Sequence, residues 1–159
     1  MTTPNKQANT DLAHDDFNLS SFFPYLVRVY YRAVSEAVSS VYSSLYKLSV
    51  SEWRTMAVLG PNRALSASEI VERSSMDKVN VSRAIKGLRN AGYLKRDIDG
   101  DDRRRAVLRL TESGADVFHA LIPKVAEVEQ QLLKGLSPQE RETLTQLMEK
   151  VQNNADHLK

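Results

Sequence analysis

The chain has 159 residues, of which 42% are hydrophobic and 26% are charged, a composition that is ordinary for one soluble globular domain. It contains no cysteine, which excludes disulfides, thiolate zinc sites and cysteine nucleophiles. No apolar run approaches the roughly 20 residues that cross a bilayer, and residues 1–17 lack the apolar segment of a secretory signal. We therefore expect a disordered polar tail on a cytoplasmic protein that makes no contact with a membrane.

The first predicted helix starts near Ser20 or Ser21 and ends at about Lys47. Either serine can serve as the N-cap, and Pro24 then falls in the first turn, where its missing N–H is no loss. Two stripes run along this helix at helical spacing, one apolar and one mixed. The apolar stripe consists of Leu19, Phe22, Leu26, Tyr30, Ala33, Ala37, Val41, Leu45 and Leu48, and the mixed stripe of Tyr25, Arg28, Arg32, Ser35 and Ser39.

Two short helices are expected next, at residues 51–59 and at about 66–74. Ser49 and Glu52 have the spacing of a capping box, in which each side chain accepts from the backbone N–H of the other residue. The second short helix is the supporting helix of a predicted helix-turn-helix, with residues 74–76 as its turn.

The following helix begins after Asp77, a good N-cap, and ends at Ala91-Gly92, because glycine adopts the left-handed C-terminal conformation without a steric clash. Its apolar positions recur at helical spacing and mark a buried stripe: Val81, Ala84, Ile85 and Leu88. The polar positions off that stripe are expected to face outward: Lys78, Asn80, Ser82, Arg83 and Lys86.

Residues 93–96 and 106–110 are predicted to pair as a β-hairpin, because residues 97–102 between them are rich in Asp and Gly. Asp102 and Arg104 share a face of the strand, so the carboxylate can orient the guanidinium. A polar-faced helix fits the major groove of DNA, and a cationic hairpin tip can reach the narrower minor groove. The predicted DNA contacts are therefore Lys78, Asn80, Ser82, Arg83 and Lys86 on the helix and Asp102, Arg103, Arg104 and Arg105 on the hairpin.

The charges are unevenly distributed along the sequence. The whole chain has 22 basic and 20 acidic residues, but residues 73–109 contain 11 basic and 5 acidic ones, so this segment carries a net charge of +6 and the remainder −4. A concentrated basic surface is the electrostatic footprint of duplex binding. The alternative that the charge count leaves open is a solvated surface with a salt-bridged hairpin.

Two further helices are predicted after the hairpin. Thr111 caps the first, which contains Pro123 and should be kinked or irregular there. Ser137 and Glu140 open the last one with a capping box. Both helices carry apolar stripes: Phe118, Leu121, Val125, Val128 and Leu132 in the first, and Leu144, Leu147, Met148 and Val151 in the last. Stripes beyond the needs of a compact domain predict a dimer interface.

A set of short motifs covers the helix-turn-helix, the hairpin and the start of the next helix. They are residues 66–71, 76–78 and 81–83, Leu88, residues 92–93 and 102–104, and the run Leu110-Thr111-Glu112-Ser113-Gly114. Together they resemble the signature of the MarR family of winged-helix transcription regulators, and a looser likeness extends from about Leu19 to the end of the chain. The resemblance implies a dimeric repressor that binds pseudo-palindromic operators, places Arg104 in the minor groove and often releases DNA when it binds a small molecule.

The expected fold is mainly α with a small antiparallel β-wing, a winged helix-turn-helix with long N- and C-terminal dimerisation helices. The expected segments are a polar tail at 1–17, the N-terminal helix of the dimerisation region at 18–48, a DNA-binding lobe at 49–110 and C-terminal dimerisation helices at 111–159. The expected partners are double-stranded DNA, a second copy of the chain and a small anionic effector.

The resemblance also implies an effector site between the first, second and long fifth helices. Tyr25, Arg28 and Arg32 offer a phenol and two cations there, and Trp53 an aromatic surface. This mixture suits an aromatic carboxylate or an acyl thioester of coenzyme A. Residues 23–28 resemble the branch of the family that regulates aromatic-acid catabolism. The alternative for Trp53 is an ordinary core side chain.

No catalytic, metal or cofactor site is predicted. His14, His119 and His157 have no partner at metal-ligand spacing, and the acidic turn 99–102 lacks the glutamate that a calcium loop needs at its twelfth position, where Leu110 stands. An enzyme is therefore not expected. The leading hypothesis is a ligand-released transcription regulator, and the alternative is a winged-helix ligand-binding or protein-docking module without specific operator recognition.

Overall fold

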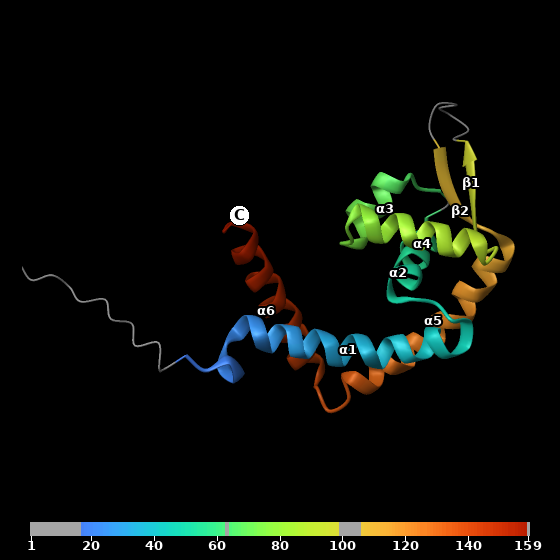
Figure 1. Ribbon diagram of the computed structural model, residues 1–159. Helices are drawn as coiled ribbons and strands as arrows, with labels where there is room; N and C mark the ends of the chain where they lie inside the picture. The colour runs from blue at the N-terminus through green and yellow to red at the C-terminus, as the bar shows by residue number, and fades with distance from the viewer. Residues whose placement is uncertain (1–16, 63, 99–105, 159) are drawn as a thin grey trace, which may run out of the picture. The chain divides into compact units, whose positions relative to one another are not determined.

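The computed structural model describes residues 17–62, 64–98 and 106–158 (Figure 1). The elements in chain order are η2 (Leu19–Ser21), α1 (Phe23–Tyr46), α2 (Val50–Leu59), α3 (Ala67–Ser74), α4 (Lys78–Asn90), β1 (Leu94–Ile98), β2 (Ala106–Leu110), α5 (Glu112–Leu132) and α6 (Pro138–Asp156). The fold is mainly α with a small antiparallel wing, as predicted. Within the described ranges, no helix is both long and apolar enough to cross a membrane.

The contacts divide the chain into two compact units, residues 1–33 and 34–159. In the first unit every described residue, from 17 to 33, is exposed, and the rings of Phe17 and Phe22 meet edge to face at 5.3 Å. The second unit contains the buried core, the helix-turn-helix and the wing.

The predicted start of the first helix is wrong. Ser20 does not cap α1, because the Asn18 side chain accepts from the Ser20 N–H at 2.9 Å and closes the separate 3-10 helix η2. Phe22 is then extended, and α1 begins at Phe23, with Pro24 in its first turn as expected. At the other end Lys47 adopts a left-handed conformation (φ 58°) and terminates the helix.

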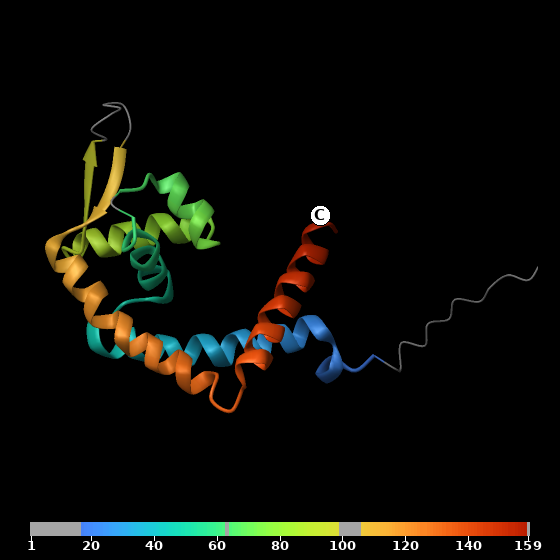
Figure 2. The ribbon, with the colours of Figure 1, turned by 180° about the vertical axis from the view of Figure 1, so that it is seen from behind.

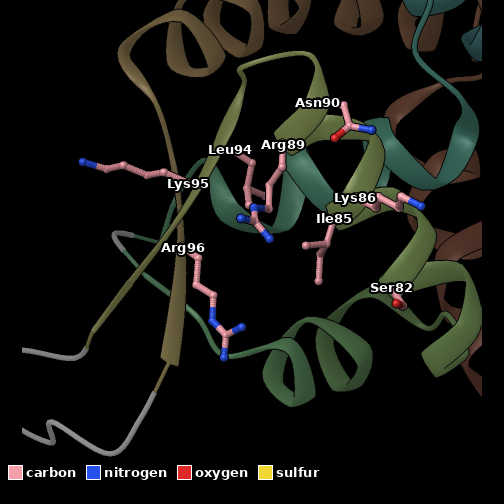
Figure 3. A pocket seen from close by; sticks show the side chains of 8 residues that line it. All are labelled: Ser82, Ile85, Lys86, Arg89, Asn90, Leu94, Lys95 and Arg96. Carbon is pink, nitrogen blue, oxygen red and sulfur yellow. The ribbon is translucent and has the colours of Figure 1, made fainter.

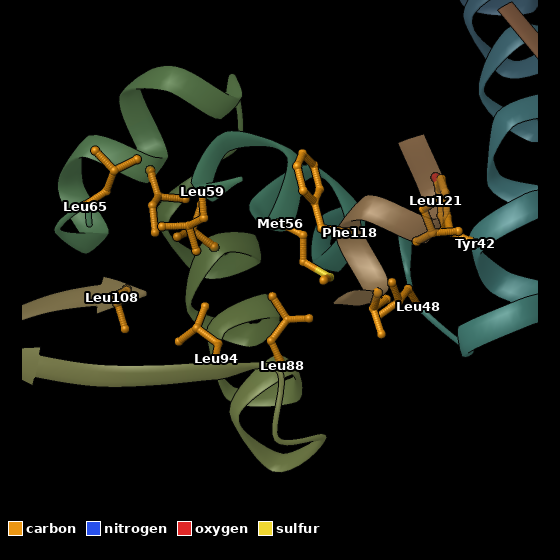
Figure 4. Close-up of a cluster of buried hydrophobic side chains, with 13 residues drawn as sticks. Tyr42, Leu48, Met56, Leu59, Leu65, Leu88, Leu94, Leu108, Phe118 and Leu121 are labelled. Carbon is orange, nitrogen blue, oxygen red and sulfur yellow. The ribbon is translucent and has the colours of Figure 1, made fainter. Parts of the chain in front are cut away.

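The core of the second unit joins the end of α1, helices α2, α3, α4 and α5, and both strands (Figure 4). Trp53 lies against this core, stacked at 5.6 Å on the ring of Tyr42 and at 6.1 Å on that of Phe118. The fully or nearly buried apolar side chains are Tyr42, Leu48, Met56, Leu59, Leu65, Ile70, Val81, Ala84, Leu88, Leu94, Val107, Leu108, Val117, Phe118 and Leu121. This set includes most of the apolar stripe predicted for α4, so the polar side of that helix is turned away from the core.

Side-chain caps fix where the helices of this unit begin. The predicted capping boxes of α2, between Ser49 and Glu52, and of α6, between Ser137 and Glu140, are confirmed. A further box between Ser66 and Glu69 opens α3. Two helices have single caps instead: Asp77 caps α4 and Thr111 caps α5, both as predicted. These caps satisfy backbone N–H groups that a helix cannot satisfy within itself.

The wing is a hairpin in which Leu94 pairs with Leu110 and Ile98 with Ala106. The first strand was predicted at 93–96, but Tyr93 lies in the turn that ends α4, where its N–H donates to the Leu88 carbonyl at 2.9 Å. The strand continues through positions 97 and 98, which were predicted as turn. The rest of that turn, 99–102, lies outside the described residues.

A compact junction joins α4, the wing and α5, where β2 runs directly into α5 (Figure 2). The Thr111 hydroxyl donates to the Gly92 carbonyl at 2.6 Å and accepts from the Gly114 N–H at 3.0 Å. The Thr111 N–H donates to the Tyr93 carbonyl at 3.0 Å. A Cβ atom on Gly114 would collide with that same carbonyl oxygen, so only glycine fits here.

A second close approach sets the distance between α2 and α4. The Glu52 carboxylate, held in its capping box by the Ser49 N–H at 2.8 Å, lies where a Cβ atom of Gly87 would be. Gly87 therefore lets the start of α2 pack directly on the middle of α4.

Helix α5 contributes its first half to the core and continues through Pro123 without interruption. Its C-terminal end is exposed at Leu132, and none of the side chains of α6 is buried. The exposed large apolar residues of α6 are Leu147 (56% exposed), Met148 (53%) and Val151 (42%).

Candidate nucleic-acid interface

The outer face of α4 carries the polar residues that were predicted to contact DNA. Val81, Ala84 and Leu88 point into the core and fix the rotation of the helix about its axis. All five predicted contacts on the helix are exposed: Lys78, Asn80, Ser82, Arg83 and Lys86. The helix-turn-helix before them is also as predicted, with Ser75 in a left-handed conformation in the turn between α3 and α4.

The first turn of α4 holds a paired Asp and Asn. One Asp77 oxygen accepts from the Asn80 backbone N–H at 2.8 Å, and the other accepts from the Asn80 side-chain amide at 2.7 Å. These two hydrogen bonds lower the pKa of Asp77, and the positive charge of Arg83 acts in the same direction. Asp77 is therefore ionised at neutral pH and can only accept hydrogen bonds.

An open pocket of about 770 Å³ lies between the second half of α4 and strand β1 (Figure 3). Arg89, Ile85 and Arg96 surround its middle, while Lys86 and Lys95 point away on opposite sides. The full lining is Ser82, Ile85, Lys86, Arg89, Asn90, Leu94, Lys95 and Arg96. Four of these residues are cationic and none is acidic, so the potential in this pocket favours anions.

Three of the cations in this pocket, Arg89, Lys95 and Arg96, were counted in the charge of the segment but not predicted as individual site residues. The turn at Gly92 (φ 78°) folds β1 back beside α4, which brings all three residues to the pocket and sets Arg96 near Arg89, while Lys95 points away (Figure 3). The sequence does contain a signal for such a pocket. It is a cation at the end of a helix, followed by a glycine turn and by cations at the start of a strand.

The predicted contacts of the wing tip, Asp102, Arg103, Arg104 and Arg105, lie outside the described residues. Nearer its base, the wing carries an ion pair between Arg109 Nε and Asp97 Oδ2 at 3.8 Å. This pair offsets one positive charge of the wing.

The residues predicted to bind an effector belong to different units. Tyr25, Arg28 and Arg32 are exposed residues of the first unit, and their spacing puts them on one side of α1. Trp53 belongs to the second unit, where it is half-buried in the aromatic stack with Tyr42 and Phe118.

Metal-ligating side chains do not cluster in the part of the chain that the structure describes. His157 Nδ1 lies 2.6 Å from the Asn153 carbonyl oxygen within α6, and the ring of His119 lies beside Phe118 at 5.7 Å. Both histidines thus make local contacts within their own helices.

Comparison with known proteins agrees with this arrangement. A model of the MarR family matches residues 46–105, the span from the end of α1 into the wing. The uncharacterized HTH-type transcriptional regulator YwaE of Bacillus subtilis is 31% identical over 111 residues, which are 70% of this chain and 65% of that protein. The chain therefore spans slightly less than two thirds of the length of that relative.

Solved structures give the same picture. A MarR/EmrR family transcriptional regulator from Acinetobacter sp. ADP1 is 25% identical, with a TM-score of 0.80 over 89% of this chain and 99% of that one. BpsR of Bordetella bronchiseptica, whose DNA binding is regulated by 6-hydroxynicotinic acid, is 23% identical and shares the fold, with a TM-score of 0.76 over 86% and 96% of the two chains. The chain belongs to the MarR family of winged helix-turn-helix transcription regulators.

Proposed function

We propose that the chain is a homodimeric DNA-binding transcription regulator, a repressor that a small anionic effector releases from its operator. It acts in the cytoplasm, uses no cofactor and catalyses no reaction. Residues 49–110 form its DNA-binding lobe, and residues 18–48 and 111–159 its dimerisation region. The observation that carries the proposal is the exposed basic surface of α4 and β1, which the buried stripe of α4 turns away from the core.

The residues of the basic surface are assigned different roles according to their position along α4 and the wing. Asn80 and Ser82 lie in the first half of α4, the part of a recognition helix that reaches base edges in the major groove. Lys86 lies farther along and borders the basic pocket, so we assign it to phosphate, and Arg83 can serve either purpose. From sequence alone, Asp102, Arg103, Arg104 and Arg105 extend the surface to the minor groove.

The basic pocket is expected to hold the phosphate backbone between the two grooves. Arg89→Gln and Arg96→Gln should each weaken binding about equally for all DNA sequences and reduce the slope of log K against log salt by about one. Lys124→Gln, which removes an exposed cation of α5 outside the pocket, is the matched control and should leave the slope unchanged. Salt titrations of operator and random DNA measure both quantities. If the slope is unchanged in both arginine variants, the phosphate backbone of the DNA does not bind in this pocket.

The apolar side chains that stay exposed in the described residues support a dimer. Large apolar side chains are exposed along the start of α1 and along α6, including Phe23, Leu26 and Tyr30 in one and Leu147 and Met148 in the other. Dimeric helix-turn-helix proteins place their recognition helices about 34–36 Å apart, one turn of DNA. The operator is accordingly a pseudo-palindrome with both half-sites on one face of the duplex.

The effector is assigned to the side of α1 that carries Tyr25, Arg28 and Arg32, and the sequence prediction adds Trp53 to this set. Two guanidinium groups and a phenol suit the carboxylate of an aromatic acid or an acyl thioester of coenzyme A. BpsR, which shares the fold, responds to an acid of this kind. The effector needs only to favour a conformation in which the recognition helices miss successive grooves, and a coupling of about 1–3 kcal/mol would weaken operator binding roughly 5–150-fold.

The Arg28→Ala variant is expected to bind the operator as the wild type does and to lose its response to the effector. The reason is that Arg28 is exposed on α1, outside the basic surface of α4 and β1. Titrating aromatic acids and their coenzyme A esters against a preformed operator complex measures the release. If no anion releases the wild type, or if Arg28→Ala is released equally well, the effector site has been assigned to the wrong residues.

A gel shift against the DNA upstream of the protein's own gene tests the function as a whole. A specific complex that resists excess random DNA is expected. The competing function is a winged-helix module that binds a ligand or a protein, and it predicts only weak, sequence-independent retention. The exposed Lys78, Asn80 and Arg83 of α4 favour operator binding over that alternative.

A further inference from the structure

The N-cap of the recognition helix differs in kind from the caps of the other helices. Helices α2, α3, α5 and α6 are capped by a serine or threonine hydroxyl, from Ser49, Ser66, Thr111 and Ser137. Helix α4 is capped by the carboxylate of Asp77. Serine caps a helix about as well as aspartate does, so capping alone does not require a negative charge at this position.

A negative charge here opposes DNA binding. Asp77 is exposed at the start of the helix that faces the duplex, and the phosphates of DNA repel it. The second carboxylate oxygen, which a serine cap would lack, accepts from the side-chain amide of Asn80 at 2.7 Å. The distinctive effect of the carboxylate is thus on the side chain of Asn80.

This contact settles which way the Asn80 amide faces. A carboxylate has no proton to donate, so the Nδ2 group of Asn80 must face Asp77 and the Oδ1 atom must face away from it. One amide N–H is then occupied, and the carbonyl oxygen and the second N–H remain available. Without Asp77 the amide could turn over and exchange the positions of its donor and its acceptor.

An acceptor beside a donor complements one base edge in the major groove. Adenine presents the N6 amino group as a donor and N7 as an acceptor, whereas guanine presents two acceptors, O6 and N7. We propose that Asp77 is a positioning residue that holds the Asn80 amide in the orientation that reads an adenine in each half-site. The inference rests on the proposed function, because it requires α4 to lie in the major groove.

The test compares Asp77→Ser and Asp77→Asn in the full-length protein. Both substitutions keep a good N-cap, so thermal unfolding should change little. Serine removes the oxygen that holds Asn80. Asparagine places an NH2 group where the second carboxylate oxygen of Asp77 was. The Asn80 carbonyl then turns toward residue 77 to accept from it, and the Asn80 NH2 group turns outward.

Binding to a panel of operators, each with one altered base pair, measures the preference. Asn80→Ala first identifies the base pair that Asn80 reads, where the wild type should favour adenine about tenfold. Asp77→Ser should reduce that preference to less than about threefold, and Asp77→Asn should shift it toward guanine, with the other positions unaffected. Asp116→Ser, which removes an exposed acid of α5, is the control for charge and should leave every preference unchanged.

The outcomes are distinguishable. If Asp77→Ser keeps the adenine preference at that position, Asp77 is only a helix cap and the proposal is overturned. If Asn80→Ala leaves all preferences intact, Asn80 reads no base and the proposal is likewise overturned, although the protein still binds DNA specifically. If the wild type shows no preference among operators, the proposed function itself fails and this inference fails with it.

Discussion

Replacing Leu147 and Val151 together by aspartate should convert the protein to a monomer and weaken operator binding at least a hundredfold. Both side chains lie on the apolar face of α6 and are half-exposed in the single chain, at 56% and 42%. Because only about half of each side chain remains to be buried, contact with a second copy would contribute about 1 kcal/mol per side chain, and an unpaired carboxylate buried there would oppose association. A monomer contacts only one half-site, so the ratio of its specific to its non-specific affinity for DNA is much smaller.

Analytical ultracentrifugation and a gel shift on the same samples test the link between assembly and DNA binding. Gln146→Asp introduces one negative charge on the opposite side of α6 and serves as the control for placing an aspartate in this helix. It should leave both the sedimentation coefficient and the operator affinity unchanged. A wild type that sediments as a monomer at micromolar concentration would rule out the proposed dimer, and a dimeric double variant would place the interface elsewhere.

Gly114→Ala should reduce the free energy of unfolding by about 3 kcal/mol, the upper end of what overpacking usually costs. The added Cβ atom would strike the Tyr93 carbonyl oxygen, which is backbone and already accepts from the Thr111 N–H. Relief requires separating the start of α5 from the end of α4, which breaks the hydrogen bonds of Thr111 as well. Chemical denaturation followed by circular dichroism measures the loss.

Gly135→Ala is the matched control for that measurement. Gly135 has a positive φ of 89° but no heavy atom within 4 Å of the added Cβ, so only the backbone preference is lost. We expect this variant to lose about 1–2 kcal/mol. If the two variants unfold at the same denaturant concentration, the close approach of Gly114 to Tyr93 contributes nothing beyond its backbone conformation.

Local signals allowed much of the fold to be predicted from the sequence. The caps at Ser49, Asp77, Thr111 and Ser137 act within four residues of themselves, so reading them needs no knowledge of the rest of the chain. The buried stripe of α4 is equally local, since its period alone shows which residues face outward. The exposed positions of Lys78, Asn80, Ser82, Arg83 and Lys86 followed from that period.

The predictions that failed depend on competing hydrogen bonds. Asn18 holds Ser20 in a separate 3-10 turn, although serine is as good an N-cap by propensity. Tyrosine is common in strands, but the N–H of Tyr93 donates to the Leu88 carbonyl in the turn that ends α4. The basic pocket could not be located in advance because it depends on where the turn at Gly92 directs β1, and that turn is set by the bonds between Thr111 and the end of α4.

The missing side chain of Gly87 has a consequence for how the chain tolerates change within α4. The space in front of Gly87 is filled by the far end of the Glu52 side chain, which also accepts from the Ser49 N–H. A larger residue at 87 would therefore displace the Glu52 carboxylate before it moved any backbone, and the capping box of α2 would be lost. The first casualty of a substitution inside α4 is thus the N-terminus of a neighbouring helix.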